Sequence, residues 1–278
     1  MDFAVVAFYG IICREMQDCT VLVCSCDKYA DILPAFVALW RRFWPDCPFE
    51  TVLVTETDPG LGGFDRTIAC GAGGTWCSRL VKALDEISTS CVLMLCDDYF
   101  LSQKVDTAQI LHRLAQMREF GAGNLRLIPN PSPSDSNSEP FAADDGLFRY
   151  RPKSAYCIAT QAGLWDRAFL RGLADGRASI WEFERYGSFD DLVGEMPVLG
   201  TAKKEFPFVD AVHKGHWERF GVDVCRENGV DISSSARTLP PLRVRLVEGA
   251  KGLVFRIFPW NWIVRAQNAI GAGAKERH

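Results

Sequence analysis

Apolar and polar segments alternate regularly through the first part of the chain. Residues 20–26 form an apolar run that predicts a buried strand, and residues 32–43 carry apolar positions at helical spacing. Two prolines within residues 45–48 end this helix, and residues 49–54 predict a second strand. The order strand, helix, strand predicts a βαβ unit.

The pattern continues after a glycine-rich loop at residues 58–75. This loop has no G-x-G-x-x-G placed between a strand and a helix, so a dinucleotide-binding fingerprint is not supported. Helical spacing returns at residues 76–87, a strand is predicted at residues 91–96, and another helix at residues 106–120.

The second half of the chain predicts fewer strands. Residues 130–145 are rich in Pro, Ser, Asn and Asp and predict a long mobile loop. A strand is predicted at residues 154–159, then a turn and helix at residues 163–174. We therefore expect one α/β domain over residues 1–240, with a mixed, mostly parallel sheet flanked by helices.

Composition fits a globular enzyme. Apolar residues make up 48% and charged residues 24% of 278 positions. The eleven cysteines are scattered without a C-x-x-C spacing, which favours a reduced, cytoplasmic protein. Residues 1–12 carry Asp2 where a signal peptide needs basic residues, so they predict a short strand. No apolar run reaches the roughly 18 residues of a membrane span.

The tail, residues 241–278, differs in chemistry from the rest of the chain. It holds seven Lys or Arg residues against two Glu, whereas the whole chain has a net charge of −4. Its aromatic and basic side chains suit a membrane surface, and oligomer contact or core packing is the alternative. Nucleic-acid binding is not favoured, because the body of the chain is acidic.

The strand predicted at residues 91–96 stops abruptly at Asp97 and Asp98. Two carboxylates at the carboxyl edge of a sheet lie where open α/β folds bind ligands. Oxygen ligands suit Mg²⁺ or Mn²⁺, and a metal held by one or two carboxylates keeps coordination positions for substrate phosphates. The alternative is that Asp97 caps the next segment and Asp98 is solvated.

Polar residues also follow the first two strands. Ser25, Asp27 and Tyr29 come after the first, at the edge where a nucleotide base and ribose are commonly held, although Asp27 equally suits a helix cap. Glu56 ends the second strand and suits a ribose hydroxyl, or simple solvation. These four residues are therefore candidates for a nucleotide site.

Basic residues and histidines supply further candidates. Ser78 and Arg79 begin a predicted helix, where Arg79 would pair with a phosphate or remain a surface arginine. His213 and His216 flank Lys214. Either histidine suits a metal or pyrophosphate, and Lys214 suits a phosphate, with a solvated loop as the alternative.

Acids beside aromatic residues predict a general base. Trp181 precedes Glu182, and Glu184 follows two positions later, so aromatic neighbours would desolvate a carboxylate and raise its pKa toward useful base strength. The same segment matches a capping box, which would commit Glu182 to a helix N-terminus. Glu184 is then the reserve, with Asp190 and Asp191 as a third option.

These segments together resemble bacterial glycosyltransferases of the GT-A fold, in a family-2-like pattern over about residues 20–240. The matching segments, in order, are residues 25–29, 44–48, 76–80, 95–101, 161–167 and 181–184.

The resemblance implies transfer of a sugar from a nucleotide-diphosphate sugar. Asp97 and Asp98 would take the role of the D-x-D motif and hold Mg²⁺ or Mn²⁺ against the donor diphosphate. Asp27 and Glu56 would hold the nucleoside. Here the two acids are adjacent, in a D-D-x-F sequence, so their division of labour stays open.

The resemblance also implies an acceptor side. Glu182 matches the acid that deprotonates the acceptor hydroxyl in similar inverting enzymes. Gln161, Trp165 and Trp181 would line the acceptor, with Trp165 offering a flat apolar face to a sugar ring.

Taken together, these features predict a cytoplasmic glycosyltransferase bound peripherally to the inner face of the membrane. Its acceptor would be a glycan or a polyprenyl-linked sugar in surface polysaccharide assembly. The alternatives are a sugar-phosphate nucleotidyltransferase and an inactive binding module of the same fold. The sequence leaves homo-oligomer formation open.

Overall fold

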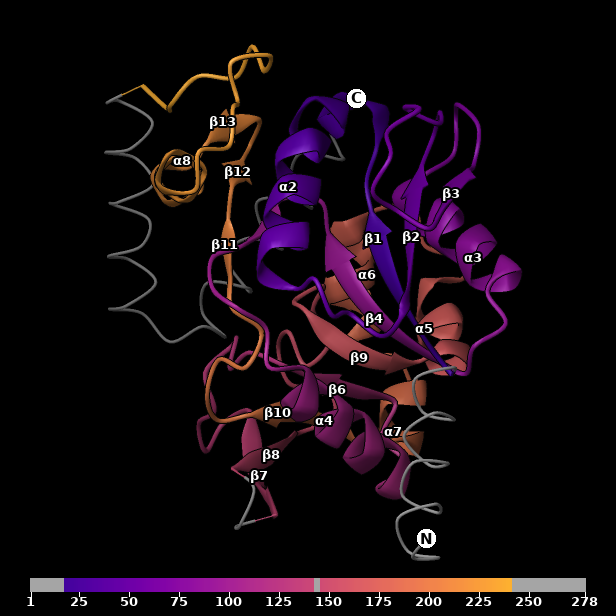
Figure 1. Ribbon diagram of the computed structural model, residues 1–278. Helices are drawn as coiled ribbons and strands as arrows, with labels where there is room; N and C mark the ends of the chain where they lie inside the picture. Colours follow the sequence, from indigo (N-terminus) through magenta and orange to yellow (C-terminus); the bar gives the residue numbers. More distant parts are fainter. Residues whose placement is uncertain (1–17, 143–145, 242–278) are drawn as a thin grey trace, which may run out of the picture.

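The computed structural model describes residues 18–142 and 146–241 (Figure 1). Within these two stretches, no helix is both long and apolar enough to cross a membrane. The strand predicted at residues 1–12 and the tail beyond residue 241 lie outside them, so both stay predictions.

A nine-stranded sheet forms the centre of the fold, in the order β3-β2-β1-β4-β9-β6-β10-β8-β7. Strands β3, β2, β1 and β4 are parallel, and β9 runs antiparallel between β4 and β6. The expected mixed, mostly parallel sheet is confirmed. The strand bounds are β1 (Cys19–Cys24), β2 (Glu50–Thr55), β3 (Arg66–Ala69), β4 (Cys91–Cys96), β6 (Asn124–Arg126), β7 (Ser138–Ala142), β8 (Leu147–Tyr150), β9 (Gly163–Asp166) and β10 (Val198–Thr201).

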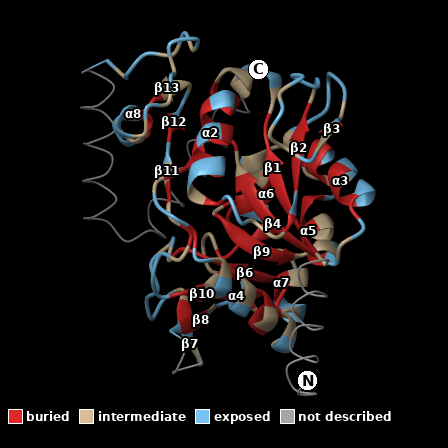
Figure 2. Ribbon diagram, viewed as in Figure 1, coloured by how far each residue is buried: buried red, intermediate tan, exposed pale blue. Residues whose placement is uncertain are grey.

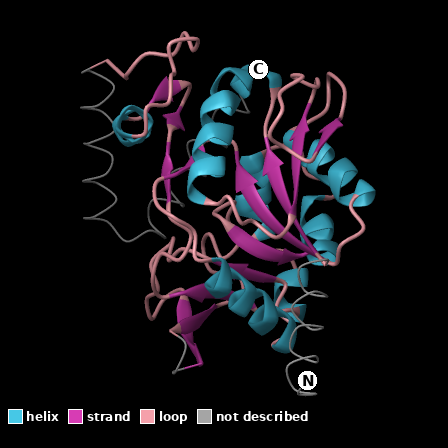
Figure 3. Cartoon of the chain, viewed as in Figure 1, coloured by secondary structure: helices cyan, strands magenta, loops and turns pink. Residues whose placement is uncertain are grey.

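Helices cover both faces of this sheet (Figure 3). The apolar side chains of α2 and α4 pack in one buried cluster, and those of α3, α5 and α6 pack in a second. The helices are η1 (Asp27–Ile32, a 3-10 helix), α2 (Leu33–Phe43), α3 (Trp76–Glu86), α4 (Thr107–Glu119), α5 (Arg167–Ala174), α6 (Ile180–Gly187), α7 (Leu192–Glu195) and α8 (Arg219–Glu227).

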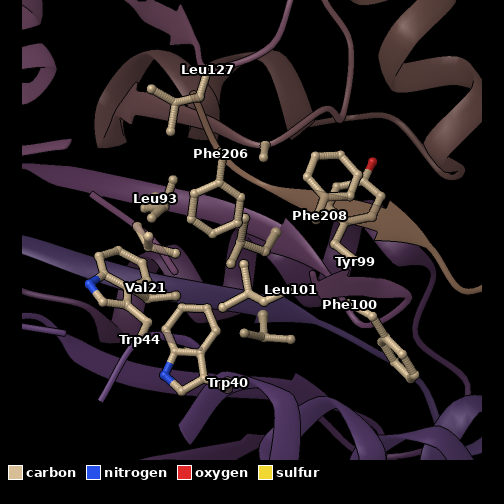
Figure 4. Packing of buried hydrophobic residues seen from close by; sticks show 14 of the residues in the cluster. Val21, Trp40, Trp44, Leu93, Tyr99, Phe100, Leu101, Leu127, Phe206 and Phe208 are labelled. Atoms are coloured by element: carbon tan, nitrogen blue, oxygen red, sulfur yellow. The ribbon is translucent and has the colours of Figure 1, made fainter. Parts of the chain in front are cut away.

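Strand β1 shows why the central strands are continuous apolar runs. Val21 and Val23 pack with α2 in the first cluster, part of which Figure 4 shows. Leu22 and Cys24 point to the opposite face and pack in the second cluster. A parallel strand covered on both sides needs apolar residues at every position. Figure 2 shows the result as a buried sheet between helices whose outer faces are exposed.

Short polar side chains explain where four of these helices begin. Thr75, Asp106, Asp166 and Ser179 each accept a hydrogen bond from a backbone N–H in the first turn of α3, α4, α5 and α6, respectively. Such N-caps satisfy amides that have no partner within the helix.

Two small sheets stand beside the main one and bring distant segments together. Strand β5 (Tyr99–Leu101) pairs antiparallel with β11 (Phe208–Asp210), so that Tyr99 lies opposite Asp210. Strands β12 (Val212–His213) and β13 (His216–Trp217) form a hairpin. Helix α8 packs closely against Ala211, which lies between β11 and β12: a Cβ at Gly221 of this helix would lie 2.6 Å from the Cα atom of Ala211.

Several sequence expectations about the second half were wrong. Residues 154–159 form turns, and the strand lies later, at β9, which takes the start of the helix predicted at residues 163–174. The second half is also not poor in strands, since β8 to β13 all lie beyond residue 146. Strands β3 and β7 lie within segments that were expected to be loops.

Candidate active site

A cleft of about 850 Å³ opens at the carboxyl ends of β1 and β4. Its lining includes Ser25 after β1 and Asp97 and Asp98 after β4, and segments from the second half of the chain close its other side. The backbone N–H of Asp97 donates to the carbonyl of Cys24, which holds the ends of the two strands together. The carboxylate pair therefore lies in a cleft at the sheet edge, as the sequence predicts.

Asp97 is buried, and one partner fixes its side chain. The Ser25 hydroxyl donates a 2.6 Å hydrogen bond to its Oδ2 atom. Burial raises the pKa of Asp97 to about 7, against the opposing effects of the Ser25 hydrogen bond and the positive charge of Arg237. A cation bound beside this buried carboxylate would stabilise its ionised form.

Asp98 and Asp210 add two more carboxylates to the cleft lining beside Asp97. Burial, with the negative charges of Asp97 and Asp210, raises the pKa of Asp98 well above its ordinary value. Burial also raises the pKa of Asp210, while the charges of Lys204 and His213 oppose the shift. Sequence reasoning missed Asp210, because a single acid far along the chain carries no local signal of its pairing with the strand that follows Asp98.

Glu184 is a further acid of the same cleft. Glu184 is buried, and its Oε1 atom accepts 2.8 Å hydrogen bonds from both the backbone N–H and the hydroxyl of Thr160. The Tyr99 hydroxyl donates to the carbonyl of Thr160 at 3.2 Å. A short chain of hydrogen bonds thus connects Glu184 with the residue next to Asp98.

The structure places Glu182 differently from Glu184. Glu182 does not line the cleft. Its Oε2 atom accepts from the backbone N–H of Ala178 at 2.8 Å, and its own N–H donates to the Ser179 hydroxyl at 3.2 Å. These two bonds form a capping arrangement that begins α6, so the carboxylate holds the helix N-terminus.

The predicted donor residues form one polar network around the end of β2. Glu56 accepts from the backbone N–H of Asp27 at 2.6 Å and pairs with Arg79 at 2.7 Å. Asp27 accepts two 2.8 Å hydrogen bonds from Thr57, and these hydrogen bonds lower its pKa. Of these residues, Arg79 lines the cleft, whereas Asp27 and Glu56 do not.

Other donor candidates divide in the same way. Tyr29 lines the cleft and Ser78 does not. The Ser78 N–H donates to the Thr75 hydroxyl, so this residue belongs to the cap of α3. Lys214 also lies outside the lining, on an exposed turn with φ of 51°, whereas Lys204 lies inside it. Sequence reasoning missed Lys204.

The acceptor candidates include one correction. Trp165 is fully buried and packs against Phe169 and Phe183, so its face is not available to a sugar. Its place in the middle of the sheet on β9 follows from pairing with both β4 and β6. Gln161 and Trp181 do line the cleft, and Trp181 is 64% exposed.

The cleft suits a divalent cation in its chemistry. Asp97, Asp98 and Asp210 offer the hard oxygen atoms that Mg²⁺ and Mn²⁺ prefer, and His213 also lines the cleft. In residues 18–142 and 146–241, no group of three or more His, Cys, Asp or Glu side chains is arranged to hold a metal ion. A metal held by one or two carboxylates and completed by substrate phosphates fits this arrangement.

Comparisons with known proteins give weak similarities. No protein-family model and no curated protein matches the chain. Among solved structures, residues 1–349 of S. aureus TarS are 14% identical, over 62% of this chain and 55% of that one, with a TM-score of 0.39. A cytidylyltransferase from Leptospira borgpetersenii is 10% identical, over 77% and 95%, with a TM-score of 0.43.

The bifunctional IspDF from Campylobacter jejuni is another such neighbour. It is 12% identical, over 65% of this chain and 48% of that one, with a TM-score of 0.37. The chain thus spans about half the length of the TarS and IspDF chains that it matches.

Proposed function

We propose that this protein is a glycosyltransferase that moves a sugar from a nucleotide-diphosphate sugar to an acceptor hydroxyl, with inversion. One observation carries the proposal: the Asp97–Asp98 pair and the buried Glu184 line one cleft at the carboxyl edge of the sheet. Open α/β sheets bind ligands at this edge. A metal-assisted, inverting sugar transfer uses cation-binding acids on the leaving-group side and a base on the acceptor side.

On the donor side, a bound Mg²⁺ or Mn²⁺ would neutralise the charge of the departing diphosphate. Asp97 and Asp98 would hold it, and Asp210 and His213 are the neighbouring candidates. Ser25 fixes the orientation of Asp97 through its 2.6 Å hydrogen bond.

The cationic residues of the cleft complete the donor side. Arg79 and Lys204 line it, and both suit phosphate oxygens. Glu56 pairs with the Arg79 guanidinium and accepts a hydrogen bond from the Asp27 amide. This network would position Arg79 and the start of η1 on the nucleoside side of the cleft.

On the acceptor side, we assign the base to Glu184. Thr160 holds its Oε1 atom with two hydrogen bonds, which fixes the carboxylate and leaves Oε2 to accept a proton. The acceptor oxygen forms a bond to the anomeric carbon while the bond from that carbon to the diphosphate oxygen breaks. The proton of the acceptor hydroxyl passes to Glu184. Gln161 and the exposed Trp181 would contact the acceptor.

The acceptor and the cellular location belong to the same proposal. A lipid-linked or glycan acceptor, used at the inner face of the membrane for surface polysaccharide, follows from the aromatic and basic tail together with the family resemblance.

A substrate panel tests the reaction class. Nucleotide-diphosphate sugars are incubated with the full-length protein and Mn²⁺, and release of nucleoside diphosphate is measured with water and with sugar acceptors. In parallel, nucleoside triphosphates with sugar phosphates are tested for pyrophosphate release. We expect release of nucleoside diphosphate. Pyrophosphate release would establish the nucleotidyltransferase alternative, and binding without turnover would establish the binding-module alternative.

A further inference from the structure

Arg237 lies about 140 positions after Asp97, yet its side chain packs against Tyr29, a residue of the cleft lining. Its guanidinium pairs with Asp31 through bonds of 2.8 Å from Nη2 to Oδ1 and 2.9 Å from Nε to Oδ2. Nη2 also donates to the carbonyl of Lys28 at 2.6 Å, and Nη1 to the carbonyl of Gly215 at 3.2 Å. One side chain thus joins η1, the β12–β13 hairpin and the segment after α8, residues 228–241.

The same guanidinium lies over an aromatic ring of the cleft. Its Cζ atom is 4.3 Å from the ring centroid of Tyr29, within the range of a cation–π interaction. Tyr29 lines the cleft, whereas Arg237 does not. The Arg237 side chain is 9% exposed, so water competes little for these contacts. The position of the Tyr29 ring therefore depends on a residue outside the cleft lining.

Neighbouring bonds hold Arg237 in place. The Ser235 hydroxyl donates to Asp31 at 2.6 Å, and the N–H of Trp217 donates to the carbonyl of Thr238 at 3.1 Å. The carboxylate of Asp31 is therefore satisfied from two residues of one segment. These contacts fix the segment after α8 against η1, which directly follows Ser25 and the end of β1.

We propose that Arg237 is a positioning residue for donor binding, which clamps η1 and holds the Tyr29 ring against the nucleotide side of the cleft. This inference rests on the proposed function for the identity of the ligand. The clamp itself does not depend on the ligand, because every contact that defines it lies within the protein.

Three substitutions distinguish the clamp from a general ion pair. Arg237→Gln removes the charge and the forked contact. Arg171→Gln is the matched control, because Arg171 also makes a forked pair, with Asp85, on the surface away from the cleft lining. Arg237→Lys keeps the charge but not the planar fork, so it tests geometry separately from charge.

The first measurement is amide hydrogen exchange of residues 27–32 in the free protein. We expect about tenfold faster exchange in Arg237→Gln, as for loss of a local clamp, and no change in Arg171→Gln. Unchanged exchange in Arg237→Gln would overturn the clamp, whether or not the protein binds nucleotides.

The second measurement is binding of UDP, GDP and dTDP by calorimetry in the presence of Mn²⁺. Arg237→Gln should weaken the binding seen in the wild type about tenfold, as for other residues that orient a ligand-contacting group, and Arg237→Lys should restore it only in part. Donor KM should rise while kcat stays within about twofold, which is the pattern of lost ground-state binding. Wild-type affinity and KM in Arg237→Gln would refute the inference, whereas absence of binding in the wild type would instead refute the proposed function.

Discussion

Exchanging Glu184 for Gln gives a sharp test of the assigned base, because the substitution keeps the shape of the side chain. The Glu184 Oε1 atom accepts two hydrogen bonds from Thr160, and a glutamine carbonyl accepts both equally well. We therefore expect a loss of unfolding free energy below about 1 kcal/mol, within the net value of one hydrogen bond. The proton acceptor, however, is lost.

Removal of a general base lowers rates by about 10²- to 10⁴-fold, so kcat for sugar transfer should fall within that range in Glu184→Gln. Donor affinity should stay close to that of the wild type. The assay is release of nucleoside diphosphate at saturating donor, with donor binding measured by calorimetry on the same preparation.

Glu182→Gln is the matched control from the same helix. Glutamine also serves in a capping box, so the rate should stay within about twofold of the wild type. Glu182→Ala should lower the unfolding free energy by about 1 kcal/mol, the net value of one hydrogen bond, with the rate retained. A full transfer rate in Glu184→Gln would refute the assignment. A loss of 100-fold or more in Glu182→Gln would also refute it, and would return the base to Glu182.

Three further experiments address other parts of the chain. Trp165→Ala should cost about 3–5 kcal/mol of unfolding free energy in urea titrations, because its ring is fully buried, and a cost below 1 kcal/mol would contradict its place in the core. The pKa of Asp31 is lowered because hydrogen bonds from Arg237 and Ser235 outweigh burial, so its contribution to stability is present above the ordinary value and lost as pH falls through the lowered pKa. Acid titration of Asp31→Asn should therefore show a smaller loss of stability below about pH 4 than the wild type, and an identical profile would contradict this. Deletion of residues 242–278 should abolish sedimentation with anionic liposomes at low salt, and unchanged sedimentation would refute the membrane role of the tail.

The first half of the fold could be predicted from the sequence because its signals are local. Strands β1, β2 and β4 are buried on both faces, so each is a continuous apolar run, and the helices between them carry clear helical spacing. Strand β3 was not recognised, since its four residues lie in a glycine-rich segment and are defined by pairing with β2.

The strand wrongly predicted at residues 154–159 shows the limit of local signals. The buried guanidinium of Arg126 donates to the carbonyls of Tyr156 and Cys157, and Tyr156 has a φ of 55°. These contacts hold the segment in turns, although its composition suits a strand. A partner about 30 residues away decides the conformation, and no pattern within the segment records it.

The residues of the cleft also divide into those with a local sequence signal and those placed by distant contacts. Asp97 and Asp98 stood out because a long apolar run ends at them. Asp210 and Arg237 reach the site only through pairing of β11 with β5 and through packing of the segment after α8, so their sequence neighbours carry no sign of it. Trp165 was assigned to the acceptor side from the family resemblance, and this prediction was wrong because the sheet buries its ring.

Calorimetric titration of UDP, GDP and dTDP with and without Mn²⁺, on the wild type and on Asp97→Asn, tests the central claim most directly. We predict that at least one diphosphate binds the wild type in the presence of Mn²⁺. Its affinity should fall by about 10- to 100-fold when the metal is removed or Asp97 is replaced. Binding that is equally strong without Mn²⁺ and in Asp97→Asn, or no binding of any of the three, would contradict a donor diphosphate site at the acidic pair.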